Sequence, residues 1–77
     1  SMNKMSVDVS DIECEEAIMV IRMTIRKNNF GYGDSFNVTS NSEPFWSLLQ
    51  KFGQNTNARI ERWGNTNGKT WTATITL

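Results

Sequence analysis

The sequence predicts an α/β (α+β) fold: a two-layer sandwich in which two helices cover one face of a four-stranded mixed sheet. Two observations lead to this prediction. Apolar and polar residues follow strand-like and helix-like patterns in the order β-α-β-α-β-β. The chain has 77 residues, and two amphipathic helices packed on one sheet let so short a chain bury its apolar stripes. We expect one domain at residues 6–77, after a tag remnant and flexible N-terminus at residues 1–5.

The second predicted element begins at the only cysteine of the chain, Cys14, just after a short strand at residues 6–10. The run at residues 12–27 is ambiguous in periodicity. From Ile21 to Ile25, apolar and polar residues alternate, which suits a strand. A helix would instead gather every third or fourth apolar residue on one face. Length favours the helix, because the run is far longer than the usual strand of about 5–6 residues.

A second strand and a second helix are predicted after a turn rich in asparagine and glycine. Residues 35–39 alternate in polarity, with Phe36 and Val38 on the inner side of the sheet. Residues 40–42 supply helix caps, and large apolar residues then recur every three or four positions. We expect this helix to end at Gly53, because glycine is common just past helix ends.

The C-terminal part predicts a β-hairpin. Its arms are residues 58–63 and 70–77, and Asn67-Gly68 between them is a type I′ turn signal. Alternation places Trp63 on the outer side of the first arm, where an exposed indole would suggest a recognition surface. A bulge or a register shift would bury the same side chain, so both outcomes remain open.

Composition excludes several classes of function. Lys plus Arg and Asp plus Glu number 8 each, so we expect no nucleic-acid binding, which depends on positive charge. The chain has no histidine and one cysteine, and we expect neither a metal nor a cofactor. No apolar run approaches the ~20 residues of a membrane-spanning helix, and no secretory signal is visible. We therefore expect a cytoplasmic monomer.

The order and spacing of elements resemble the TusA/SirA family of small sulfur-carrier proteins. Those proteins have a short strand, a Cys-Pro-x-Pro motif at the start of a helix rich in valine and methionine, and a glycine-containing turn. The matching segments here are residues 7–8, 14–17, 18–26 and 33–34. The resemblance covers roughly residues 6–77 and implies the same two-layer fold.

The motif itself is divergent. It is Cys14-Glu15-Glu16-Ala17 in this chain, so Glu15 and Ala17 stand where the family has prolines. Asp11 stands where a glycine usually precedes the cysteine by three residues. The fold is therefore the stronger implication of the resemblance, since function depends on the site rather than on the fold.

The resemblance implies a sulfurtransferase-like relay in which Cys14 accepts sulfur from a donor persulfide and passes it on. The implied partners are a donor protein, such as a cysteine desulfurase or a rhodanese-like protein, and an acceptor protein. Arg22, Arg26 and Trp63 are candidate docking residues, although a solvated basic face also explains the two arginines. The alternative function is a non-catalytic interaction module that keeps the fold and has lost sulfur transfer.

Two electrostatic effects oppose each other at Cys14. A helix N-terminus favours an anionic sulfur by roughly 0.3–1 kcal/mol. The neighbouring carboxylates of Glu13, Glu15 and Glu16 disfavour it. We therefore expect a basic surface on a partner to complete the site.

Overall fold

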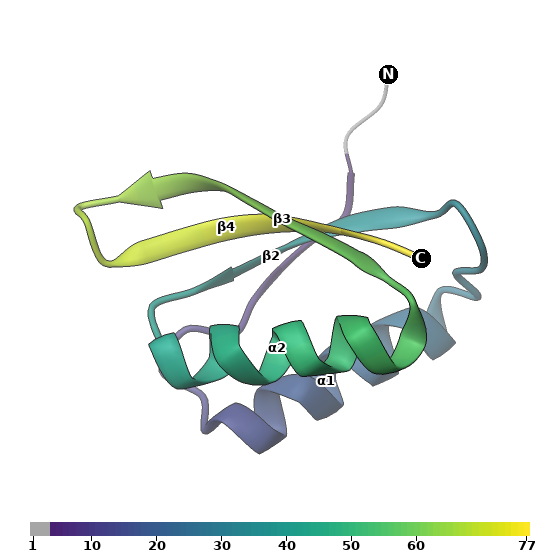
Figure 1. Cartoon of the computed structure of the whole chain (residues 1–77), viewed down its shortest axis with the longest axis horizontal. Helices are drawn as coiled ribbons and strands as arrows, with labels where there is room; N and C mark the ends of the chain where they lie inside the picture. Colours follow the sequence, from purple (N-terminus) through teal and green to yellow (C-terminus); the bar gives the residue numbers. More distant parts are fainter. Residues whose placement is uncertain (1–3) are drawn as a thin grey trace.

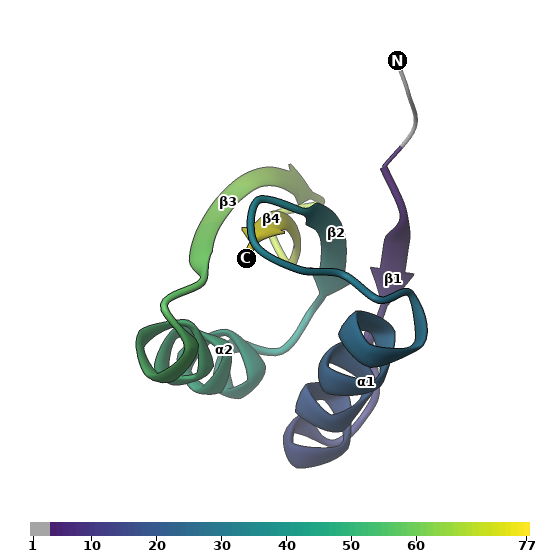
Figure 2. The same cartoon turned by 90° about the vertical axis from the view of Figure 1, so that its right-hand side faces the viewer.

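Two helices pack against one face of a four-stranded sheet, which confirms the predicted fold (Figures 1 and 2). The computed structural model describes residues 4–77. The tag remnant and flexible N-terminus expected at residues 1–5 fall largely on residues 1–3, which lie outside the described residues. The elements follow the predicted order: β1 (Ser6–Asp8), α1 (Cys14–Lys27), β2 (Ser35–Ser40), α2 (Glu43–Thr56), β3 (Arg59–Thr66) and β4 (Thr70–Thr76).

The sheet is mixed, with the strand order β1-β2-β4-β3. β1 and β2 are parallel, whereas β4 runs antiparallel to both β2 and β3. The parallel pair is connected through α1, because parallel neighbours need a crossover. β1 and β3 form the two edges, with α1 beneath the β1 side and α2 beneath the β3 side (Figure 2).

Alternation along the two central strands positions the core. Phe36 and Val38 of β2 are fully buried, as predicted, and so are Ala73 and Ile75 of β4. The threonines of β4 alternate with these residues and so occupy the opposite face of the sheet. The helices complete the core with seven apolar side chains: Ala17, Ile18 and Ile21 from α1, and Phe45, Trp46, Leu49 and Phe52 from α2.

The ambiguous run after residue 12 is a helix. α1 begins at Cys14, and Glu13 caps it, because the Glu13 carboxylate accepts a hydrogen bond from the Glu16 backbone N–H at 3.2 Å. This bond satisfies one of the donors that the first turn of a helix leaves unpaired. Like α2, α1 has 14 residues. Among the described residues, no helix is both long and apolar enough to cross a membrane.

β1 is shorter than predicted, since it covers Ser6–Asp8 rather than residues 6–10. The Ser10 backbone N–H donates to Asp8 Oδ1 at 2.9 Å, and Asp11 has a positive φ of 62°. Aspartate is among the few residues that adopt this left-handed conformation readily. The chain therefore turns out of the strand soon after Asp8.

The prediction that the second helix ends at Gly53 is wrong. α2 covers Glu43–Thr56 and ends at Asn57, which has the left-handed conformation with φ 61°. Gly53 is buried inside the helix, where a Cβ atom would lie 2.7 Å from Ile60 Cδ1 and 3.1 Å from the Ala58 carbonyl oxygen. The glycine therefore permits a close approach between α2 and the start of β3.

The hairpin turn follows the prediction, but its first strand is longer than residues 58–63 because pairing continues to Thr66. Asn67 and Gly68 have positive φ values of 58° and 70°. The Lys69 backbone N–H donates to the Thr66 carbonyl oxygen at 3.2 Å. Positive φ at both central positions is the requirement of a type I′ turn, which explains the Asn-Gly pair.

Trp63 lies at a bulge and remains exposed. The pairing register shifts between Arg62 and Gly64, so Trp63 is the extra residue of β3. Its side chain is 61% exposed, and its indole N–H donates to Thr74 Oγ1 at 2.9 Å. Because Thr74 lies on the sheet face opposite the helices, Trp63 lies there too.

Candidate functional site

Cys14 is held at the start of α1 by a loop that is tied to a second loop. β1 and β2 are parallel, so the loops that lead into α1 and α2 leave the same end of the sheet. The Asp11 backbone N–H donates to Asn41 Oδ1 at 3.2 Å, and the Asn41 side-chain amide donates to Asp11 Oδ1 at 3.0 Å. This reciprocal pair fixes the chain three residues before the cysteine.

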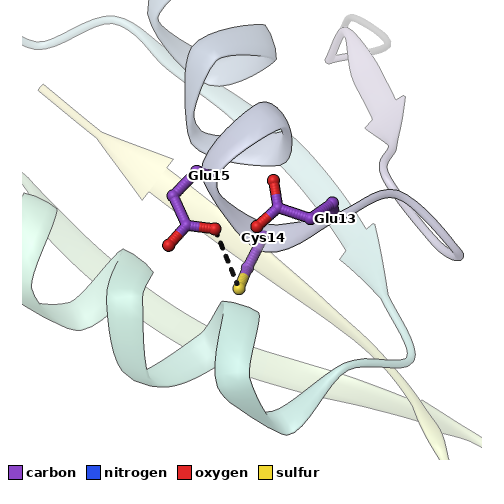
Figure 3. A group of neighbouring side chains, drawn as sticks. All are labelled: Glu13, Cys14 and Glu15. Carbon is purple, nitrogen blue, oxygen red and sulfur yellow. Dashed lines mark hydrogen bonds between the residues drawn. The ribbon is translucent and has the colours of Figure 1, made fainter.

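The Cys14 sulfur lies between solvent and the edge of the core. The residue is partly buried and packs against the cluster of buried apolar side chains. Figure 3 shows the side chain pointing toward α2, with the carboxylates of Glu13 and Glu15 close by. The thiol donates to Glu15 Oε1 at an S–O distance of 3.8 Å. The thiol therefore lies at the edge of the core with carboxylates beside it.

Glu13, Cys14 and Glu15 place two carboxylate oxygens and one sulfur within 4.8 Å of one another. This spacing would allow contact with one cation. Both carboxylates are exposed, however, and exposed acidic groups are common without a metal, so we assign no metal to them. The consequence that follows from the geometry is a negative potential around the sulfur.

We expect Cys14 to react faster with a positively charged methanethiosulfonate reagent than with a negatively charged one. A unit charge about 4 Å away contributes on the order of 1 kcal/mol in water, so two carboxylates should produce a rate ratio of about tenfold or more at low salt. The rate of each reaction is measured as the loss of free thiol over time. Each rate is then divided by the rate at which the same reagent modifies 2-mercaptoethanol. The ratio should fall as salt is added.

The variant Glu13→Gln/Glu15→Gln should bring the normalised rate ratio close to that of 2-mercaptoethanol, which carries no charge near its thiol. Glu61→Gln is the matched control, because Glu61 is exposed in β3, the edge strand away from α1, and should leave the ratio unchanged. Equal normalised rates in the unmodified protein would contradict the negative potential.

The motif residues after the cysteine shape the start of the helix. Ala17 is fully buried, and its backbone N–H donates to the Glu13 carbonyl oxygen at 2.9 Å. A proline has no backbone N–H and would lose this bond. Alanine at position 17 therefore lets α1 begin as early as Cys14. Glu15 and Glu16 occupy the first turn, where negative charge suits the helix dipole.

The candidate docking residues do not join the cysteine. Arg22 and Arg26 line a hollow of about 320 Å³ with residues of α2, and the Arg22 guanidinium lies 4.9 Å from the centre of the Phe52 ring. At 1.5 Å per residue, these arginines lie about 12 and 18 Å along α1 from Cys14. Trp63 lies on the opposite face of the sheet.

Sequence patterns did not reveal a cluster centred on Arg62. Its guanidinium lies 4.4 Å from the Trp71 ring centre and 4.9 Å from the Trp46 ring centre, and Nη2 lies 3.3 Å from Glu43 Oε2. Glu43, Trp46 and Arg62 line a cleft of about 600 Å³ between α2 and β3. Alternation along β3 could have placed Arg62 on the helix-facing side, opposite Ala73.

The Asp11–Asn41 pair was also missed. Asn41 stood out in the sequence only as a possible helix cap, and Asp11 only as a departure from the glycine of the family pattern. The positive φ of Asp11 explains why glycine suits that position. Nothing in the local sequence connects the two residues, which are thirty positions apart.

Comparison with known proteins identifies the fold. No protein-family model matches the chain, and no curated protein matches it. The crystal structure of a SirA-like protein from Desulfitobacterium hafniense has a similar fold, with a TM-score of 0.70 and 20% sequence identity. The match covers 94% of this chain and 95% of that chain. This protein therefore has a SirA-like fold.

Proposed function

From this SirA-like fold and the position of Cys14, we propose that the protein is a sulfur carrier that relays persulfide sulfur on Cys14 to a partner protein. The observation that carries the proposal is the free, partly buried cysteine at the first position of α1. Unpaired backbone N–H groups and the helix dipole favour negative charge there. The thiolate is the form that attacks sulfur.

Sulfur transfer takes two exchange steps. In the first, the Cys14 thiolate attacks the terminal sulfur of a donor persulfide; a new S–S bond forms at Cys14, the donor S–S bond breaks, and the donor leaves as a thiolate. In the second, a nucleophile on the acceptor takes the terminal sulfur, and Cys14 leaves as a thiolate. The two steps together need no added oxidant or reductant.

The exposed carboxylates around Cys14 favour a partner with a basic docking surface. Glu13, Glu15 and Glu16 are all exposed at the start of α1. A basic surface would pair with them and would also stabilise the Cys14 thiolate. The donor would be a protein such as a cysteine desulfurase or a rhodanese-like protein, and the acceptor a second protein.

Arg22, Arg26 and Trp63 are proposed as secondary contacts. The two arginines would meet acidic groups on a partner that also reaches along α1. Trp63 is available on the other face of the sheet. We propose a cytoplasmic setting, because a reducing compartment keeps a lone thiol free. The equal numbers of acidic and basic residues give no support to nucleic-acid binding.

Loading with sulfur tests the proposal directly. The protein is incubated with a cysteine desulfurase and cysteine, and its intact mass is measured without reductant. We expect a gain of one sulfur atom that dithiothreitol removes. Cys14→Ser should show no gain, whereas Glu61→Gln, which changes an exposed carboxylate of β3, should load like the unmodified protein.

A SirA-like protein with an intact Cys-Pro-x-Pro motif serves as the positive control for the desulfurase. If that control is loaded and this protein is not, sulfur transfer is excluded for this donor, and the non-catalytic interaction module becomes the better explanation. A gain that persists in Cys14→Ser would exclude Cys14 as the carrier residue.

A further inference from the structure

The outer face of α1 has an exposed apolar centre. Met19 and Met23 are 59% and 58% exposed, and Met5, which lies beside this helix, is 42% exposed. Among residues 4–77, these are three of the five large apolar side chains that are exposed. Met5, Val20 and Met23 also border a hollow of about 340 Å³. Methionine suits protein contacts because its unbranched, polarizable side chain adapts to the opposing surface.

Opposite charges flank this apolar centre along the helix. Glu15 and Glu16 lie in the first turn of α1, and Arg26 and Lys27 lie in the last turn. All four side chains are exposed. The outer face of α1 therefore runs from acidic through apolar to basic.

The three parts are arranged symmetrically about Ile21. Glu16 lies five positions before Ile21 and Arg26 lies five positions after it. Met19 and Met23 lie two positions before and after it. A second copy of α1, laid antiparallel across this face, would place its basic end against the acidic end of the first. The methionines of both copies would meet in the centre.

We propose that the outer face of α1 is a homodimer interface in which two copies pack with their α1 helices antiparallel. A two-fold axis makes such a contact self-complementary, as most homodimer interfaces are. A parallel arrangement would instead bring like charges together, which costs free energy. The charge order thus selects both the occupant, a second copy of this chain, and its direction.

The interface is small, so the dimer is weak. A helix of 14 residues is about 21 Å long and about 10 Å wide. One face of it therefore covers on the order of 200 Å², which is less than the roughly 800 Å² that each partner buries in a stable interface. We therefore expect a dissociation constant of about 0.1–1 mM. We therefore expect a monomer at micromolar concentration.

Dimerisation leaves Cys14 free. The buried residues Ala17 and Ile21 mark the inner face of α1, and Cys14 lies on that same face, one and two turns before them. Met19 and Met23 lie on the opposite face. The two proposals share Glu15, Glu16 and Arg26 as contact residues, but dimerisation is measured by mass and sulfur transfer by sulfur loading, so either proposal stands if the other fails.

Sedimentation equilibrium from about 20 μM to about 2 mM, a range that brackets the expected dissociation constant, tests the dimer. The average mass should rise from 8.8 kDa toward twice that value. Glu15→Lys/Glu16→Lys makes both ends of the face basic, and Arg26→Glu/Lys27→Glu makes both ends acidic. Each variant alone should stay monomeric. An equimolar mixture of the two should associate again, at least as strongly as the unmodified protein.

Each charge-reversal variant places unfavourable charges at a helix end. Circular dichroism is therefore used to check that both variants are folded. Lys51→Glu reverses an exposed charge on α2 and is the matched control, which should dimerise normally. Met19→Gln/Met23→Gln should be monomeric at all concentrations. A mass of 8.8 kDa throughout the range, or a mixture that fails to associate, would overturn the proposal.

Discussion

Replacing Phe36 with alanine is expected to lower the free energy of unfolding by about 3–5 kcal/mol, the usual loss for a buried phenylalanine. Phe36 is fully buried between the sheet and the helices, and its ring stacks on Phe30 with centroids 5.5 Å apart. A chain of this length has a total stability of about 4–12 kcal/mol at 0.05–0.15 kcal/mol per residue. The variant should therefore be close to the limit of folding.

Urea denaturation at 25 °C followed by circular dichroism measures this loss. Tyr32→Ala is the matched control, because Tyr32 is an aromatic residue of the same region and is 100% exposed. It should change the free energy of unfolding by less than about 0.5 kcal/mol. Similar losses in the two variants would mean that Phe36 does not occupy the core.

Replacing Gly53 with valine is expected to destabilise the protein by about 1–3 kcal/mol, the usual cost of overpacking. The Cβ atom would lie 2.7 Å from Ile60 Cδ1 and 3.1 Å from the Ala58 carbonyl oxygen, so the Ile60 side chain and the backbone at Ala58 would both have to shift. Valine is only a few tenths of a kcal/mol better than glycine in a helix, which is too little to compensate. Thermal and urea unfolding both measure the change.

A second substitution distinguishes a clash from a general effect of valine. In Gly53→Val/Ile60→Ala, the shortened Ile60 side chain makes room, so the loss should be smaller than the sum of the two single losses. Gly31→Val is the control, because a Cβ atom at Gly31 meets nothing within 4 Å. Strict additivity in the double variant would argue against the contact.

Patterns that involve neighbouring residues predicted most of the fold. The period of two in β2 placed Phe36 and Val38 inside correctly. The length of the run from Cys14 favoured a helix correctly, although its period was ambiguous. The Asn67-Gly68 pair indicated a turn whose backbone needs positive φ, which depends on these two residues alone.

Features that depend on distant residues could not be predicted. Gly53 was interpreted as a helix end because glycine often is one, yet its role here is set by Ala58, which precedes β3, and by Ile60 in β3. The bulge at Trp63 arises from the pairing of β3 with β4, which a pattern in one strand does not reveal, and Trp63 is nevertheless exposed on the outer side where alternation placed it. The Gly53 error comes from treating a tertiary constraint as a local one.

For the candidate site, the sequence located Cys14 and its acidic neighbours but not their supports. Cys14 lies at the first position of α1 with carboxylates beside it, as the sequence predicts. The Asp11–Asn41 pair that fixes the loop joins residues from two separate βα connections. Arg22 shares a helix with the cysteine, yet the helix length separates the two by about 12 Å.

The bulge at Trp63 also protects the molecule from aggregation. β3 is one of the two edge strands, and a long, flat edge can pair with the edge of another molecule and seed fibrils. The bulge bends this edge, and Arg59, Glu61 and Arg62 add charges along it. The other edge, β1, is only three residues long. Neither edge offers a growing β-aggregate a straight template, so we expect a concentrated solution of the folded protein to form no strand-mediated polymers.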